Sequence, residues 1–272
     1  MRLSDYEKQV LREIEAWQRD DGTALVRAIS WAMLPVDWLV DSFVPDRVTD
    51  QLGEAVGQAL GMLSDTAAWT LDAPGLLRRA AELGITAERT EDLRDADLEL
   101  LDSLALQTLA ENSLLAALEG GGMGLGGPAL IAADIPLLFA INFRLLLQIG
   151  ASYGFAMQSP DYRDLVLAIF NVAASGTREA KSSAMREVSV AAASFAHDFT
   201  YSGRGMGDTF RNQNRHLPRE IGKNLLGRKL AQLVPLAGAA VGAGVNYWFT
   251  QQTAAAARMI FRAIYIERRE RV

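Results

Sequence analysis

The sequence predicts an all-α protein, built as a single multi-helix bundle with Gly-rich interhelical turns. Half of the 272 residues are hydrophobic, with alanine and leucine the commonest among them, a composition typical of helices. β-branched runs of strand length are scarce, which disfavours a sheet. No Pro- or Ser-rich linker divides the chain, so we expect one helical domain over residues 1–272.

The first predicted element is an amphipathic helix at the N-terminus. Its apolar residues recur at helical spacing, at Leu3, Tyr6, Val10, Ile14 and Trp17. The segment is charged and lacks the apolar core of a signal peptide, which favours a cytoplasmic protein. The chain has no cysteine, which excludes disulfides, thiol catalysis and thiolate metal sites.

Further helices follow along the first half of the chain. An apolar stretch at 24–44 is interrupted by a proline and two aspartates, so it does not suit a membrane span. A helix is predicted over 47–69, and the sequence DAPG at 72–75 ends it as a turn before another helix begins at Leu76. We expect a long acidic helix over 91–118, stopped by the glycines after it.

The charge of the chain is divided between two segments. Residues 82–119 contain ten acidic and two basic residues, a local charge of −8, which a solvated helix face explains. Residues 204–229 contain seven basic and two acidic residues, a local charge of +5. The uncharged segment 230–257 follows, and this order is typical of an anionic-lipid contact beside an apolar surface.

Six of the eight residues at 120–127 are glycine. A phosphate-binding loop is excluded because no Gly-Lys-Ser/Thr follows and no strand pattern precedes the glycines. Asp134 and Pro136 are typical of a helix N-cap and first turn, so a helix from Ile135 to Gly150 would measure roughly 22 Å. A membrane span needs about 30 Å, so we predict a buried helix entered through a glycine hinge.

The remaining segments contain two more amphipathic patterns and a turn. Helices are predicted over 160–174 and 178–200, and the sequence YSGRGMGD at 201–208 is a flexible turn. Basic residues then recur at four-residue intervals around Pro218 and continue up to the uncharged segment. The predicted anionic-lipid contacts are Arg211, Arg215, Arg219, Lys223, Arg228 and Lys229.

Four motifs resemble the EcsC protein family: DLELLDSLA at 97–105, EGGGMGLGG at 119–127, ADIPLLFAINFRLLLQIGASYGF at 133–155, and the segment 227–267. The EcsC-like region is 76–267, and we expect the helical part at 1–75 to pack on it. The family is named after a protein encoded beside an ABC-transporter pair, and the resemblance implies no catalytic residues. It draws attention to Asp134, Pro136, Arg144, Tyr153 and Gly154, and to Pro235, Gly238, Gly242, Asn246, Arg258 and Arg262.

Several of these residues are candidates for a buried polar network. Arg258 and Arg262 are four residues apart and share a helix face. We expect Asp134 or Glu267 to neutralise them, because an unpaired buried guanidinium is costly, and we expect Arg144 to lie in the protein interior. Structural locking is favoured over ligand binding. The candidate residues are Asp134, Arg144, Tyr153, Asn246, Arg258, Arg262 and Glu267.

Small residues predict close helix packing at two places. Gly238 and Gly242 form a G-x-x-x-G pattern, which promotes helix pairing in membranes and close packing in soluble bundles. Such faces also suit a homo-oligomer. The residues predicted for hinges and helix packing are Gly120, Gly124, Gly126, Gly127, Gly238, Gly242 and Gly244.

These features favour a non-enzymatic, membrane-associated protein that binds anionic lipid or a membrane transporter as an accessory component at the inner face of the cell membrane. The alternative is a hydrolase-like enzyme with a polar site among Asp134, Arg144, Arg258 and Arg262. No catalytic motif surrounds His197 or His216, so we expect no catalytic residue, metal or cofactor. The acidic composition disfavours nucleic acid as a partner.

Overall fold

The computed structural model describes residues 3–19, 71–123, 127–158, 162–175, 178–179, 181–186 and 238–271. Throughout these ranges the regular elements are helical and none is a strand, which confirms the predicted all-α class. The helix predicted over 47–69, the turn at 201–208 and most of the helix predicted over 178–200 lie outside the described residues. The single-domain organisation stays a prediction.

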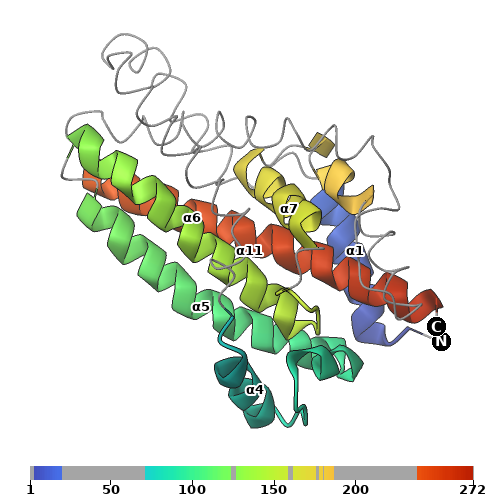
Figure 1. The fold of residues 1–272 in the computed structure, drawn as a ribbon. Coiled ribbons are helices and arrows are strands. Elements are labelled where there is room, and N and C mark those ends of the chain that lie inside the picture. Colours follow the sequence, from blue (N-terminus) through green and yellow to red (C-terminus); the bar gives the residue numbers. More distant parts are fainter. Residues whose placement is uncertain are drawn as a thin grey trace.

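Three long helices form the body of the protein (Figure 1). The helices α5 (Leu98–Met123) and α6 (Gly127–Ser152) run antiparallel as a hairpin, and α11 (Gly238–Arg271) packs along both of them. With 34 residues, α11 is about 51 Å long at 1.5 Å per residue. The C-terminal end of α5 and the N-terminal ends of α6 and α11 meet at one end of the bundle.

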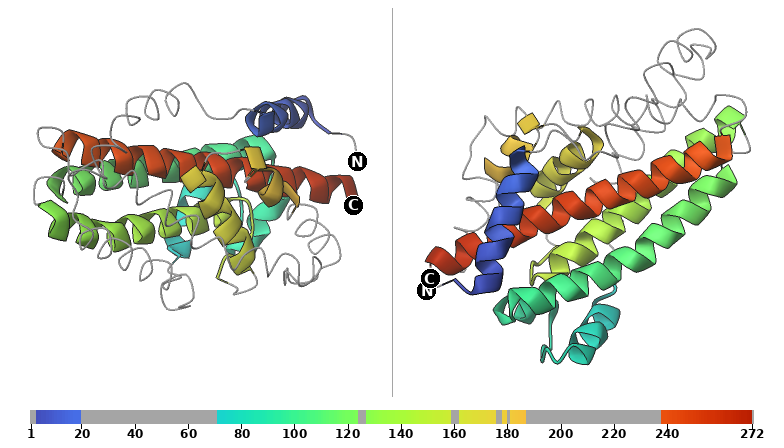
Figure 2. Two further views of the ribbon diagram at one scale, coloured as in Figure 1. Left: turned by 90° about the horizontal axis from the view of Figure 1, so that it is seen from above. Right: turned by 180° about the vertical axis from the view of Figure 1, so that it is seen from behind.

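Shorter helices pack around this three-helix body (Figure 2). The helix α7 (Arg163–Ser175) lies on α11, and α1 (Asp5–Arg19) packs on α11 and α5. The helix α4 (Ala73–Glu82) and the 3-10 helix η2 (Thr90–Asp95) pack against each other, α4 also against α5 and η2 also against α6. The C-terminal part of α11 lies beside α1, a helix from the other end of the chain (Figure 2).

Local sequence explains where the first helices begin and end. Ser4 and Glu7 form a reciprocal cap at the start of α1, with the Ser4 N–H donating to Glu7 Oε2 at 2.6 Å and the Glu7 N–H donating to Ser4 Oγ at 3.1 Å. Asp72 caps α4 by accepting from the Gly75 N–H at 3.0 Å. The DAPG sequence is thus the start of a helix, where a turn before Leu76 was predicted.

The acidic segment differs from its prediction at both ends. A single helix was expected over 91–118, but η2 occupies Thr90–Asp95 and α5 begins at Leu98 after extended backbone at Ala96. The helix α5 then continues to Met123, so the glycines at 120–122 are helical and do not stop it. Packing of α5 on α6 and α11 outweighs the helix-breaking preference of glycine, which is about 1 kcal/mol per residue.

The start of α6 also corrects the sequence prediction. The helix begins at Gly127 and has Pro136 in its interior, so Asp134 is not an N-cap. Proline removes one backbone hydrogen bond from a helix, and the packing of α6 on α5 and α11 sustains the helix across it. Residues 145–155 are buried, which confirms a buried helix in this half. Among the described helices, none combines the length and apolarity that crossing a membrane requires.

Aromatic rings and one glycine connect α6, α7 and α11 in the core. Phe139, Phe170 and Phe249 come from these three helices, and their ring centroids are 5.7 to 6.2 Å apart. Gly154, just after α6, has φ +79°, and a Cβ there would lie 2.3 Å from the backbone nitrogen of Arg94. Only glycine therefore lets the end of α6 approach η2 so closely.

Candidate functional site

A buried carboxylate, Asp102, is the centre of the main polar network. The Asp102 cluster consists of Asp102 on α5, Arg262 on α11, Tyr6 and Glu13 on α1, and Tyr153 in the turn after α6. Asp102 is 2% exposed and Arg262 is 3% exposed. Charged groups are rarely buried so completely unless they are paired, so their hydrogen bonds decide what the cluster can do.

Every acceptor position of Asp102 is occupied. Arg262 donates from Nε to Oδ1 at 2.7 Å and from Nη2 to Oδ2 at 2.6 Å, a bidentate pair. Tyr153 donates its hydroxyl to Oδ1, and Tyr6 donates its hydroxyl to Oδ2, both at 2.5 Å. The remaining Arg262 nitrogen, Nη1, donates to Glu13 Oε2 at 2.9 Å. The cluster therefore joins α1, α5, α11 and the turn after α6, and both oxygens of Asp102 and all three nitrogens of the Arg262 guanidinium have hydrogen-bond partners.

The pKa shifts of three members of the cluster favour their protonated forms. Burial, followed by the negative charge of Asp102, raises the pKa of Tyr153 far above its ordinary value. Burial and the hydrogen bond to Asp102 raise the pKa of Tyr6 to about 12. Burial disfavours the charged form of Arg262, but the hydrogen bonds and charge of Asp102 outweigh it and raise the pKa. Both tyrosines therefore stay hydrogen-bond donors, and neither serves as a general base near neutral pH.

A second set of contacts fastens the C-terminal turns of α11. Arg269 forms an ion pair with the buried Glu7 at 3.1 Å and donates to the Tyr265 hydroxyl at 2.9 Å. Tyr265 donates to the carbonyl of Ala96 at 2.7 Å, and Arg268 donates to the carbonyl of Arg94. Side chains of α11 thus satisfy backbone carbonyls around η2 and hold α1 in place.

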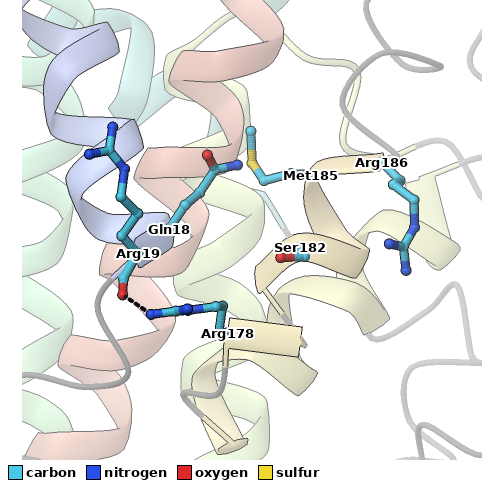
Figure 3. A pocket seen from close by; sticks show the side chains of 6 residues that line it. All are labelled: Gln18, Arg19, Arg178, Ser182, Met185 and Arg186. Atoms are coloured by element: carbon cyan, nitrogen blue, oxygen red, sulfur yellow. Dashed lines mark hydrogen bonds between the residues drawn. The ribbon is translucent and has the colours of Figure 1, made fainter.

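The C-terminal end of α1 lies beside the helical residues 178–179 and 181–186, and a surface pocket lies between these segments (Figure 3). Lys181 donates to the carbonyl of Trp17 at 3.0 Å, and Arg178 donates to the carbonyl of Arg19 at 2.9 Å. These are carbonyls that a helix end leaves without partners. The pocket has a volume of about 460 Å³ and is lined by Gln18, Arg19, Arg178, Ser182, Met185 and Arg186.

The structure brings together two of the predicted network residues, Arg262 and Tyr153, and places Arg258 close enough to affect the pKa of Tyr153. The prediction that Asp134 or Glu267 pairs with Arg262 was wrong. Asp102 and Glu13 neutralise Arg262, and Glu267 pairs with Arg271 at 2.7 Å. Burial of Arg144 was also wrong, since this side chain is exposed.

Other predicted residues lie outside the network or outside the described part. Asn246 is buried in α11, and the side chain of Asp134 is outside the described residues. Gly120 lies within α5, Gly127 begins α6, and Gly238, Gly242 and Gly244 form the start of α11. The residues outside the described part are Gly124, Gly126, Arg211, Arg215, Arg219, Lys223, Arg228 and Lys229.

Sequence reasoning missed Asp102, Tyr6 and Glu13 as members of the network. The signal for Asp102 was present, because it lies four residues after Leu98 and three before Ala105, on the apolar face of its helix. A carboxylate on such a face requires a buried partner. Glu13 follows Tyr6 by seven residues, which places both on one face of α1, but nothing local in the sequence pairs that face with Arg262.

Comparison with known proteins gives a consistent result. The model of the EcsC protein family matches residues 8–265. The chain is 29% identical over 172 residues to Protein EcsC of Bacillus subtilis (strain 168), a match covering 63% of this chain and 66% of that protein, just under two thirds of its length. It is 23% identical over 244 residues to Uncharacterized protein YdbA of the same organism, covering 88% of this chain and 85% of YdbA. No solved structure matches.

Proposed function

This chain belongs to the EcsC protein family, and we propose that it is a non-enzymatic accessory protein that binds the cytoplasmic face of the cell membrane through anionic lipid or a membrane transporter. The observation that carries the proposal is the uneven charge of the three-helix body. We call the residues 112–123, 127–137 and 238–247 the charge-poor end of the bundle. Of these 33 residues, only Glu119 and Asp134 are charged.

The three segments of the charge-poor end lie together in space. Three residues separate the last residue of α5 from the first residue of α6. The start of α11 lies beside these two helix ends in every view (Figures 1 and 2). A group of helix ends with few charged residues and no lysine or arginine in its sequence lowers the desolvation cost of contact with lipid. This end of the bundle supports a peripheral mode of contact in which the helices touch the membrane without crossing it.

The basic segment supplies the electrostatic part of the proposal. Residues 204–229 have a local charge of +5 and end nine residues before α11 begins. Near an anionic membrane each lysine or arginine contributes about 1 kcal/mol of attraction. In this proposal the basic segment binds the membrane in a way that depends on lipid charge, and the charge-poor end adds an apolar contact that does not depend on it.

The test is flotation of the full chain with lipid vesicles. We expect binding to vesicles that contain phosphatidylglycerol, and at least tenfold weaker binding to phosphatidylcholine alone. R211Q/R215Q/R219Q removes three charges of the basic segment and should weaken binding. R12Q/R78Q/R144Q is the matched control, because these three arginines are exposed elsewhere on the described surface, and it should bind as the wild type does.

The remaining outcomes separate lipid from a transporter as the partner. If purified protein binds neither kind of vesicle but binds native membrane vesicles, protease treatment of the vesicle surface should abolish that binding when the partner is a protein. Absence of binding to all three membranes would overturn the proposal.

The enzyme alternative receives less support from the geometry. Of its four proposed residues, Arg144 is exposed and Arg262 has all three guanidinium nitrogens engaged by Asp102, Glu13 and Met259. A catalytic group needs a free donor, acceptor or electron pair that a substrate can reach. The Asp102 cluster therefore fits a structural role better than a catalytic one.

A further inference from the structure

The pocket beside the C-terminal end of α1 carries an inference that does not depend on the charge-poor end or the basic segment. Two helical regions form it, with Gln18 and Arg19 on one side and residues 178–186 on the other (Figure 3). Arg178, Ser182 and Arg186 are spaced by four residues, so they follow one helix face. None of the six lining residues is acidic.

The charges around the pocket are unevenly arranged. The guanidinium of Arg19 pairs with Glu15 at 2.7 Å and extends away from Ser182, while its carbonyl accepts from Arg178 (Figure 3). That hydrogen bond fixes Arg178 at the wall, which reduces the entropy lost when it binds a ligand. Lys181 lies behind the wall with its Nζ 5.1 Å from the centre of the Trp17 ring. Residues 178–186 contain three basic side chains and one acidic side chain, Glu179, so the net charge of this segment is positive.

We propose that this pocket binds a small organic phosphate. Arginine matches a phosphate geometrically because its planar fork donates two parallel hydrogen bonds. The Ser182 hydroxyl and the Gln18 amide supply further donors, and Met185 supplies an apolar wall. A volume of about 460 Å³ exceeds what a bare phosphate needs and falls in the range of small-molecule sites. A phosphate ester with a short uncharged group fits this combination.

Such an ester has two sources, a phospholipid headgroup and a free phosphate ester. Titration calorimetry with the full chain, free of vesicles, measures binding of glycerol 3-phosphate and, for comparison, inorganic phosphate. Flotation with phosphatidylglycerol vesicles measures binding of the headgroup form. We expect saturable binding in at least one arm, with glycerol 3-phosphate binding more tightly than inorganic phosphate when the ligand is free.

Charge-neutralising variants connect that binding to the pocket. R178Q/R186Q should weaken it at least tenfold, whereas R12Q/R144Q, which removes two exposed arginines elsewhere, should change it less than twofold. R186Q alone leaves the hydrogen bond between Arg178 and Arg19 intact and keeps the test valid if the double variant is poorly folded. Circular dichroism verifies the fold of each variant.

Each result supports or overturns the site. Binding of free ester that R178Q/R186Q abolishes, without an effect on flotation, identifies a soluble phosphate ester as the ligand. Loss in the flotation arm alone identifies a headgroup. Absence of binding in both arms, or binding that R186Q and R178Q/R186Q leave unchanged, would overturn the proposal. Vesicle binding that persists in these variants and depends on residues 211–219, together with no free-ester binding that the variants weaken, leaves the proposed membrane function intact while rejecting this pocket.

Discussion

The two ends of the three-helix bundle are built on opposite principles. At the end formed by residues 258–271 of α11, seven of fourteen residues are charged, and their side chains bind α1, α5 and the backbone around η2. At the charge-poor end, two of 33 residues are charged and seven glycines stand at helical positions. Glycine lowers helix stability by about 1 kcal/mol relative to alanine. One end is thus specified by directional polar contacts and the other by small size and low charge.

The two compositions imply different roles for the two ends of the bundle. The Asp102 cluster fixes four segments relative to one another with hydrogen bonds that are all satisfied, and such saturated networks specify a single arrangement. The charge-poor end has a composition that tolerates an apolar environment.

The largest effect is expected at Asp102. Replacing it in D102A leaves the Arg262 guanidinium buried with Glu13 as its one remaining carboxylate partner among the described residues and removes the acceptor of two tyrosine hydroxyls. Breaking a buried ion pair on one side destabilises a protein by about 3 to 5 kcal/mol. Urea denaturation should therefore show a loss of that size in D102A.

The matched control for Asp102 is Glu99, which lies on the same helix but is exposed. E99A should change the free energy of unfolding by no more than about 0.5 kcal/mol. A loss below about 1 kcal/mol in D102A would mean that the buried network contributes little to stability.

Two glycines with the same backbone conformation provide the next test. Gly154 has φ +79° and Gly84 has φ +81°, but a Cβ at Gly154 would meet Arg94 whereas a Cβ at Gly84 meets no atom within 4 Å. G84A should lose about 1 to 2 kcal/mol, the penalty of the left-handed conformation. G154A should lose about 2 to 4 kcal/mol because overpacking is added. Equal losses in thermal or urea unfolding would show that the α6 turn moves away from η2 without penalty.

These residues also show how far the sequence alone could predict the molecule. The helical class and the apolar faces of α1 and α5 follow from composition and spacing, because burial on one face is a local pattern. Helix ends were harder to predict. Asp134 and Pro136 have the residue types of an N-terminus, yet packing contacts extend α6 eight residues further, to Gly127. Tertiary contacts of this kind have no local signature.

The candidate site divides in the same way. Arg262 was identified because a regular spacing placed it on one helix face, but its carboxylate partner is 160 residues away in the sequence. Pairing across that separation depends on how α5 and α11 pack. A single sequence does not indicate which residues pair across such a separation, although it does show that Asp102 lies on an apolar helix face. The pocket at Arg178 was missed because α1 and residues 178–186 meet only in the fold.

Two exposed apolar side chains allow a test of membrane contact, one within the charge-poor end and one outside it. Tyr247 on α11 is 45% exposed and Leu106 on α5 is 44% exposed. Tyr247 lies about 14 Å along α11 from Gly238, the first residue of that helix, and Leu106 lies about 26 Å along α5 from Met123, the last residue of that helix. Y247E should weaken binding to phosphatidylglycerol vesicles about tenfold, through lost apolar contact and repulsion by the anionic surface.

Leu106 serves as the distance control for Tyr247. L106E introduces the same charge more than a Debye length, about 8 to 10 Å, further from the end, so its effect should stay below threefold. Equal weakening in both variants would place the membrane contact elsewhere on the molecule. Thermal unfolding should change little in either variant, because both side chains are exposed.

The smallest effect is expected from the Tyr6 hydroxyl. Y6F removes one hydrogen bond to Asp102 and should lose about 1 kcal/mol near neutral pH, since Arg262 still donates to the same oxygen. The pH dependence is more informative. The pKa of Tyr6 is raised from 10.0 to about 12 by burial and by Asp102, so the folded protein holds this proton more tightly than the unfolded chain does.

That raised pKa sets the sign and the window of the test. The contribution of Tyr6 is fully present below pH 10 and is lost as the pH rises to about 12, so the wild type should lose stability more steeply than Y6F across this window. Urea denaturation of both proteins from about pH 8 to about pH 12 measures the difference, in which the titration of lysines common to both cancels. Y247F, changed at an exposed position outside the Asp102 cluster, should follow the wild type. Parallel curves for Y6F and the wild type would mean that α1 is not held to Asp102 through this hydroxyl in solution.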